Sequence, residues 1–167
     1  MKEIFERRSV RSFTDREVEK EKIEMLLRAA MQSPTGGDQR EWHFVVVTDR
    51  ETLNKLGDCS AHAASTKTAP VVIVPCADMS KCMFPELWEQ DLGASAQNIL
   101  LEGFHLGLGC VWQAVAPYAD REEAVKKVLK LPDNIRPFAF VSVGYSDNIP
   151  PKEDRFDKSR VHLEKWR

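Results

Sequence analysis

Two short basic segments carry side-chain types that can bind a phosphate group. The first consists of Arg7, Arg8, Ser9 and Arg11. The second, near the C-terminus, consists of Lys158, Ser159 and Arg160. Guanidinium groups bind phosphate through paired charge-assisted hydrogen bonds, and a neighbouring hydroxyl can complete the cradle. Taken alone, such basic clusters are common features of solvated surfaces, and an anion site is the alternative that their chemistry allows.

Other kinds of active site find little support in the pattern. The four histidines have no spacing that demands a catalytic role, and the four cysteines form no CxxC pair, so we expect no metal site. The glycines Gly107 and Gly109 form only a Gly-x-Gly, and they follow a helical stretch instead of a strand. This argues against a Rossmann dinucleotide site. We expect no catalytic nucleophile from the protein.

Apolar periodicity and turn residues predict the elements that position these segments. Helices are expected at Lys2–Arg8, Glu19–Met31, Glu51–Leu56, Pro85–Leu106 and Arg121–Leu129. Strands are expected at Trp42–Val47, Val71–Val74, from Cys110 onward, and at Phe138–Val143. Helices and strands are interspersed, but some connections are too short for a regular βαβ repeat. We therefore expect an α+β fold.

The composition is that of one globular domain covering residues 1–167. The chain is 43% hydrophobic and 30% charged, with a net charge of -2, so a polybasic nucleic-acid binder is not expected. No stretch approaches the roughly 20 apolar residues of a membrane span, and the first ten residues lack an apolar signal core. We expect a protein of the cytoplasm without nucleic-acid or membrane partners.

The last segment, residues 145–167, differs from the rest of the chain. It contains Pro150 and Pro151, many charges and no apolar periodicity. Alone it cannot bury much surface, so it is either disordered or wraps over another surface. The aromatic Phe156 and Trp166, with Val161 and Leu163 between them, favour wrapping, and a partner subunit is one candidate.

Taken in order, the motifs resemble those of the nitroreductase family. They are RRSVRSF, PTGGDQREW, APVVIV, DLGASAQNILLEGFHLGLGCVWQ, FVSVGY and the basic tail. The resemblance covers nearly the whole chain. It implies a central, mostly antiparallel sheet flanked by helices, and a homodimer with FMN at the interface. It also implies that the C-terminal tail wraps the partner subunit.

The resemblance assigns FMN contacts to three groups of residues. The phosphate would be held by Arg7, Arg8, Ser9, Arg11, Lys158 and Arg160. The ring would be approached by Pro34, Thr35, Gly36 and Asp38, and its reactive edge by Trp112, Gln113, Ala114 and Val115. Asp38, Arg40 and Glu41 depart from the family pattern, which usually has Asn, Gln and Pro there. Asp38 could therefore contact the flavin or pair with Arg40 instead.

The implied reaction is a ping-pong transfer of hydride. NAD(P)H would reduce the flavin and leave, and a nitroaromatic, quinone or free flavin would then take its place. Phe84 and Trp88 fall where the family has a variable substrate-covering segment, so they could stack on an acceptor or pack in the core. The alternatives are another flavin reaction of the family, such as dehalogenation or flavin fragmentation, and a non-enzymatic FMN carrier or sensor.

Overall fold

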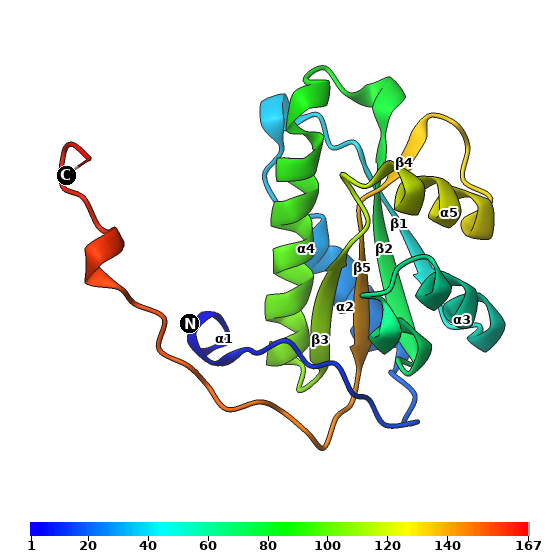
Figure 1. Cartoon of the computed structure of the whole chain (residues 1–167), viewed down its shortest axis with the longest axis horizontal. Helices are drawn as coiled ribbons and strands as arrows, with labels where there is room; N and C mark the ends of the chain where they lie inside the picture. The colour runs from blue at the N-terminus through cyan, green and yellow to red at the C-terminus, as the bar shows by residue number, and fades with distance from the viewer. Residues whose placement is uncertain (167) are drawn as a thin grey trace.

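An antiparallel sheet with helices on both faces forms the centre of the structure (Figure 1). A computed structural model describes residues 1–166; Arg167, at the end of the predicted tail, lies outside them. The strands are β1 (Trp42–Val47), β2 (Val71–Asp78), β3 (Gly109–Ala114), β4 (Ile135–Pro137) and β5 (Ala139–Gly144). Their order is β1-β2-β5-β3, with every pair antiparallel and β4 beside the end of β2. The predicted α+β class is confirmed.

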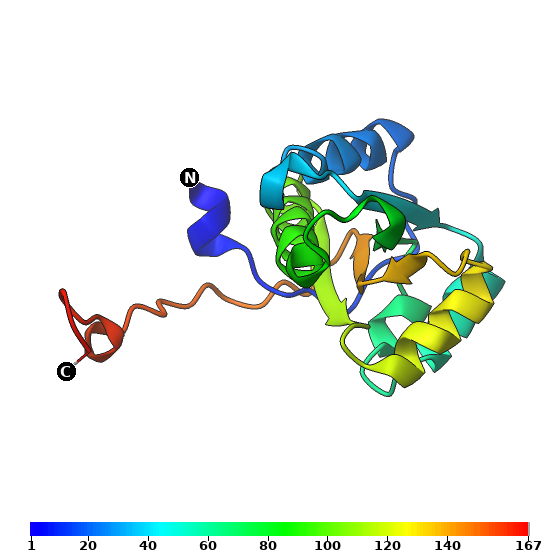
Figure 2. The ribbon, with the colours of Figure 1, turned by 90° about the horizontal axis from the view of Figure 1, so that it is seen from above.

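Each face of the sheet packs against its own pair of helices (Figure 2). One pair is α2 (Lys20–Ala30) and α4 (Trp88–His105); the other is α3 (Arg50–Asp58) and α5 (Ala119–Leu129). All eight residues of β2 are buried because helices cover the sheet on both sides. This explains why its sequence is a nearly continuous apolar run instead of an alternating one.

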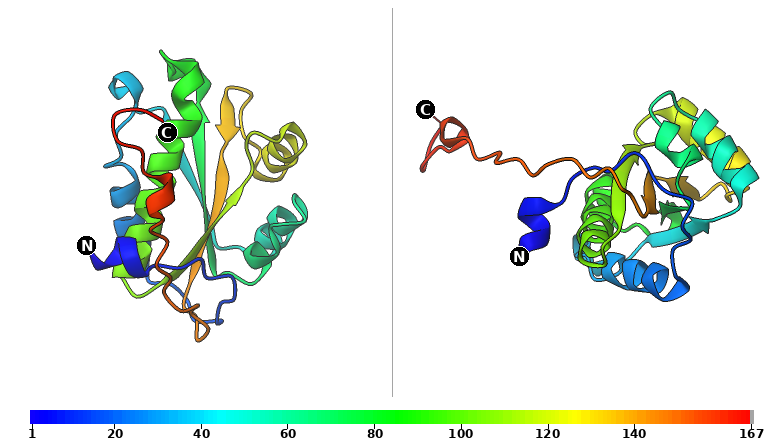
Figure 3. Two further views of the ribbon diagram at one scale, coloured as in Figure 1. Left: turned by 60° about the vertical axis from the view of Figure 1, so that its left-hand side comes forward. Right: turned by 90° about the horizontal axis from the view of Figure 1, so that it is seen from below.

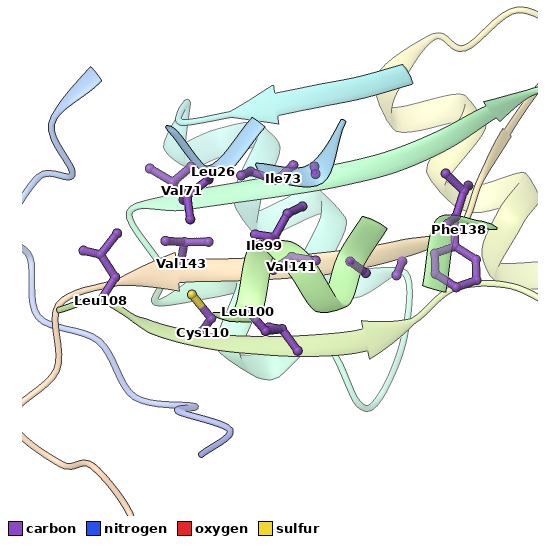
Figure 4. Packing of buried hydrophobic residues seen from close by; sticks show 14 of the residues in the cluster. Leu26, Val71, Ile73, Ile99, Leu100, Leu108, Cys110, Phe138, Val141 and Val143 are labelled. Carbon is purple, nitrogen blue, oxygen red and sulfur yellow. The ribbon is translucent and has the colours of Figure 1, made fainter. Parts of the chain in front are cut away.

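The helix α4 forms the main contact with the sheet. Its residues Leu92, Ala96, Ile99 and Gly103 are buried, at spacings of four, three and four. Ile99 and Leu100 pack beside side chains from β2, β3 and β5 in the core between helix and sheet (Figure 4). The long central helix expected from the sequence is therefore present, with a short 3-10 turn at Pro85–Leu87 before it.

The N-terminal segment follows the edge of the sheet beside β3. After α1 (Lys2–Glu6), Ser9 forms a parallel bridge with Cys110, and the Val10 N–H donates to the Cys110 carbonyl at 3.0 Å. The approach is close: a Cβ at position 109 would lie 2.6 Å from Val10 Cγ1, so Gly109 is required there. This contact fixes the basic residues 7–11 alongside β3.

Several elements differ from the expected ones; the first helix, for example, ends at Glu6 instead of Arg8. The strand β2 runs to Asp78, four residues past the predicted end, because β1 and β4 both pair with it. The short strand β4 was not expected. Phe138 lies between β4 and β5, and its N–H donates to the Pro75 carbonyl at 2.9 Å. The chain at Pro75 therefore takes part in pairing although proline has no N–H to donate.

The C-terminal segment leaves the body after β5 and extends away from it, as Figures 1 and 3 show. It ends in a short 3-10 turn, Lys158–Arg160. Its large apolar side chains are exposed: Ile149, Phe156, Val161, Leu163 and Trp166. Within residues 1–166 no helix combines the length and the apolar character needed to cross a membrane.

Candidate functional site

An open pocket of about 540 Å³ lies at the end of β3. Its walls include Arg11, Trp112, Gln113, Ala114, Tyr118 and Arg121. The pocket thus brings one residue of the N-terminal basic segment together with three of the four residues, 112–115, that the sequence assigned to the flavin edge. This proximity depends on the pairing of residues 9–10 with β3, which the sequence alone did not predict.

The Gln113 side chain points into the protein instead of the pocket. Its amide donates to the His62 carbonyl at 2.7 Å, and its carbonyl oxygen accepts from the hydroxyls of Ser142 at 2.9 Å and Thr66 at 3.2 Å. The side chain is buried and its polar atoms all have partners. Only the main chain of Gln113 is left to face a ligand.

The other three residues assigned to the flavin edge have different surroundings. Trp112 packs its ring 5.4 Å from that of Phe138, on the α4 side of the sheet. The Ala114 carbonyl accepts from Arg121 at 3.1 Å, and that guanidinium lies 3.9 Å from the centre of the Tyr118 ring. Val115 corrects the expectation: its side chain is fully buried and its N–H donates to Phe138, so it does not line the pocket.

A second hollow, of about 700 Å³, lies between the N-terminal segment and the start of the tail. Arg7 and Arg8 line it, together with residues 152–156. Arg8 donates to the Pro151 carbonyl and lies 3.3 Å from the Glu153 carboxylate. Two of the predicted phosphate ligands therefore share one cavity, where an acidic side chain of the tail already contacts one of them.

The tail's own basic residues lie elsewhere. Lys158 and Arg160 are exposed in the far 3-10 turn, and Arg160 pairs with Asp157 at 3.0 Å. In Figures 1 and 2 this turn stands well away from the N-terminal segment of the same chain. The two basic segments are not brought together within one chain.

The glycine loop lies at the opposite end of α4 from the N-terminal segment. Gly36 donates to Asp91 in the first turn of α4, whereas Glu3 contacts His105 in the last turn. The helix has 18 residues. Its ends are therefore roughly 27 Å apart at 1.5 Å per residue. A single chain thus keeps the loop and the basic segment well separated.

The loop itself turns sharply at its glycines. Gly37 has φ +59°, and a Cβ there would also lie 2.6 Å from the Phe84 ring. Asp38 and Arg40 form a paired ion contact at 2.7 Å for both bonds, and Arg40 lowers the pKa of the Asp38 carboxyl. Of the two alternatives for Asp38, this chain contains the pairing with Arg40.

Three polar side chains beneath the loop escaped the sequence prediction: Gln39, Glu41 and Asp91. Asp91 accepts from the Gly36 N–H at 3.0 Å and from the Gln39 amide at 2.9 Å. Glu41 is fully buried, and burial raises the pKa of its carboxyl, with the nearby Asp91 charge adding to the rise. The sequence did contain a sign of the Asp91 position: Asp91 falls three residues after Trp88, on the face of α4 that is buried.

Phe84 and Trp88 occupy different environments. Trp88 is 4% exposed and meets Phe138 edge to face at 5.9 Å, so it packs in the core. Phe84 is half-exposed against the glycine loop. Of these two, only Phe84 is placed to touch a ligand on the surface.

No group of three or more His, Cys, Asp or Glu side chains suited to a metal occurs in the part of the chain that the structure describes.

Comparisons with known proteins converge on one family. The model of the nitroreductase family matches residues 4–84 and 66–145. A proposed NADH dehydrogenase/NAD(P)H nitroreductase of Methanothermobacter thermautotrophicus is 44% identical over 160 residues, covering 96% of this chain and 84% of its own.

Solved structures give the same result. A proposed NADH oxidase of Clostridium acetobutylicum is 48% identical with a TM-score of 0.95, covering 98% of this chain and 99% of its own. An FMN-dependent nitroreductase of Clostridium difficile is 32% identical with a TM-score of 0.90, covering 96% of each chain. The expected nitroreductase fold is confirmed.

Proposed function

Because the chain belongs to the nitroreductase family, we propose that it is an FMN-dependent homodimer. It transfers hydride from NAD(P)H to an aromatic nitro compound, a quinone or a flavin. The observation that carries the proposal is the meeting of Arg11 with the main chain of β3 at one pocket, while Arg7 and Arg8, a few residues earlier in the chain, line a second cavity. A cationic end beside an uncharged strand edge suits a ligand with a phosphate and a flat ring.

The residues present fit the cofactor. Arg7, Arg8 and Arg11 supply guanidinium groups for the phosphate, with Ser9 among them. The pocket of about 540 Å³ is large enough for a ring system, since ligand sites span roughly 300–1,000 Å³. When bound, FMN supplies the hydride-accepting centre that no side chain of the protein provides. The chain's own part is to bind the cofactor, orient it and exclude water from one face.

The separation of the binding groups supports the homodimer. The loop Pro34–Asp38 and the start of the N-terminal segment contact opposite ends of α4, so a second copy could bring its loop to the basic residues of the first. The tail gives independent support because five large apolar side chains lie exposed on it. Burying these side chains on a partner would be favourable, at about 25 cal/mol per Å². Lys158 and Arg160 would then reach the partner's side of the site.

A single open pocket is compatible with the ping-pong order, since donor and acceptor can occupy it in turn. Near the strand edge, Tyr118 and Arg121 lie where they can contact either one. The second candidate is an FMN carrier or sensor that uses the same residues without rapid turnover. A different flavin reaction of the family would also use this pocket and would differ in the molecule that the reduced flavin acts on.

The first test is an absorbance spectrum of the purified protein, from 300 to 600 nm, before and after anaerobic NADH and NADPH. Flavin bands that bleach with either donor support the oxidoreductase. Bands that persist with both favour the carrier. A protein that stays colourless after incubation with FMN would contradict the proposal as a whole.

A further inference from the structure

Two buried carboxyl groups, those of Glu41 and Asp91, meet beneath the glycine loop. Glu41 is fully buried and Asp91 is 7% exposed. The Gln39 amide lies between them, 2.9 Å from one Asp91 oxygen and 3.3 Å from Glu41 Oε1. Asp91 also accepts from the Gly36 N–H. The pair therefore joins the loop, the start of β1 and the first turn of α4.

No cation neutralises this pair within residues 1–166. Neither carboxyl takes part in an ion pair there, and Arg40, next along the chain, is bound to Asp38. The Cys82 thiol lies near the pair, and burial, together with the charges of Glu41, Asp78 and Asp91, raises its pKa. The basic side chains nearby contact Asp78 instead of the pair: Lys81 lies 3.6 Å and His43 3.9 Å from the Asp78 carboxyl. The surroundings of the pair are therefore acidic or neutral.

Two adjacent carboxylates in such a place cannot both be ionised, because like charges repel strongly where water is excluded. Glu41 Oε2 is buried and receives no hydrogen bond from any donor in the described chain. An ionised oxygen would need such a donor, but a protonated oxygen is itself a donor. Asp91 is the neighbouring acceptor, since its carboxylate and that of Glu41 contact the same Gln39 amide.

We propose that Glu41 and Asp91 share one proton and act together as positioning residues that hold the loop from Thr35 to Arg40 in its binding conformation. Glu41 carries the proton and donates a hydrogen bond to Asp91. Asp91 also accepts from Gly36 and Gln39, while the Gln39 carbonyl accepts from the Phe84 N–H at 3.1 Å. One proton thereby fixes both the glycine loop and the Phe84 segment that packs on it.

The effect on FMN rests on the proposed function, because the loop matters to the flavin only if the flavin is bound there. Loss of the proton leaves two buried negative charges, and the loop can relieve their repulsion by opening. The proton is held more tightly in the closed loop than in an open, solvated one. Closure is therefore fully favoured below the ordinary pKa of a glutamate and is lost as the pH rises through the raised pKa of Glu41.

Infrared spectroscopy of the unaltered protein tests the shared proton without any ligand. A protonated carboxyl absorbs at a different frequency from a carboxylate, and isotopically labelled glutamate shifts the band of a glutamic acid only. We expect one such glutamic-acid band at neutral pH, present in the wild type and absent in Glu41→Gln. Absence of a glutamate-derived band in the wild type overturns the shared proton, whether or not the variant folds.

FMN affinity as a function of pH tests the positioning role. Glu41→Gln keeps the size and the donor of the protonated side chain and cannot ionise. Wild-type affinity should fall by up to about tenfold per pH unit above the transition, whereas the variant should lose this dependence. Glu86→Gln, an exposed carboxylate in the neighbouring turn, is the matched control and should follow the wild type.

The outcomes separate the two proposals. Parallel pH profiles for the wild type and Glu41→Gln, with FMN bound by both, would overturn the positioning role and leave the flavin enzyme intact. Failure of every variant and of the wild type to bind FMN would overturn the proposed function and, with it, the role of the pair toward flavin. The infrared band then still decides whether Glu41 and Asp91 share a proton.

Discussion

The guanidinium of Arg8 donates to the main-chain carbonyl of Pro151 and thereby ties the beginning of the tail to the N-terminal basic segment. Glu153 adds an ion pair with the same guanidinium at 3.3 Å. The tail thus leaves the body next to the cations proposed to bind phosphate. A phosphate that reaches Arg8 must compete with the Glu153 carboxylate.

Removing this competitor should tighten FMN binding. An exposed ion pair contributes about 0.2–1 kcal/mol, so Glu153→Gln should lower the Kd for FMN by up to about fivefold. Quenching of FMN fluorescence at low ionic strength measures the change, and added salt should reduce it. Glu123→Gln, an exposed partner of Lys127 on α5, serves as the control. Weaker binding by Glu153→Gln would contradict the arrangement.

Arg7→Ala should weaken FMN binding without disturbing the fold. A hydrogen bond to a charged group contributes about 1.5–3 kcal/mol, which corresponds to a loss of roughly tenfold to a hundredfold in affinity. Arg28→Ala, which removes an exposed guanidinium paired with Glu24 on α2, should leave the affinity unchanged. Equilibrium titration measures affinity, and circular dichroism checks helix content. Unchanged affinity in Arg7→Ala removes this residue from the site.

FMN and the dimer should depend on each other. If the loop of one chain completes the pocket of the other, removal of FMN should weaken the dimer and dilution should release FMN. Sedimentation velocity at several protein concentrations, with flavin absorbance followed together with protein absorbance, measures both. A monomer that keeps FMN at every concentration would disprove the shared site.

Gln113→Leu should destabilise the fold, whereas a matched substitution on the surface should not. The substitution removes the partner of the His62 carbonyl and of the Thr66 and Ser142 hydroxyls. Buried polar groups left without partners cost about 1–3 kcal/mol, which urea unfolding should detect as a lower free energy of unfolding. Gln90→Leu, at an exposed position of α4, is the control. Equal stability of the two variants would refute this role of the network.

The free energy of unfolding should decrease at acidic pH because Glu19 becomes protonated. Its own main-chain N–H and the Tyr145 hydroxyl, 2.7 Å away, lower the pKa of Glu19 to about 2. A lowered pKa means that the stabilisation is present above the ordinary value of 4.5 and is lost as the pH falls towards about 2. The difference in unfolding free energy between wild type and Glu19→Gln should therefore be constant above this window and shrink within it. A difference that does not vary with pH would rule out this linkage.

The sequence by itself determined the elements and the family. The three-to-four spacing of apolar residues in α2 and α4 and the aromatic, β-branched run of β1 are local patterns, and local sterics and side-chain direction are enough to interpret them. The basic segment 7–11 was also recognisable, since guanidinium chemistry does not depend on the fold. The strand β4, only three residues long, was missed because its pairing with β2, and not its own composition, makes it a strand.

Only the tertiary structure decided which residues meet. Pairing of Val10 with Cys110 places Arg11 at the end of β3, and the register of β3 turns the Gln113 side chain inward. Glu41 and Asp91 are 50 positions apart, and nothing local predicts that they share a buried site. Such contacts arise from long-range packing, in which each position is set by many weak interactions at once. For this reason the sequence named the candidate chemistry, whereas the fold decided which side chains are placed to perform it.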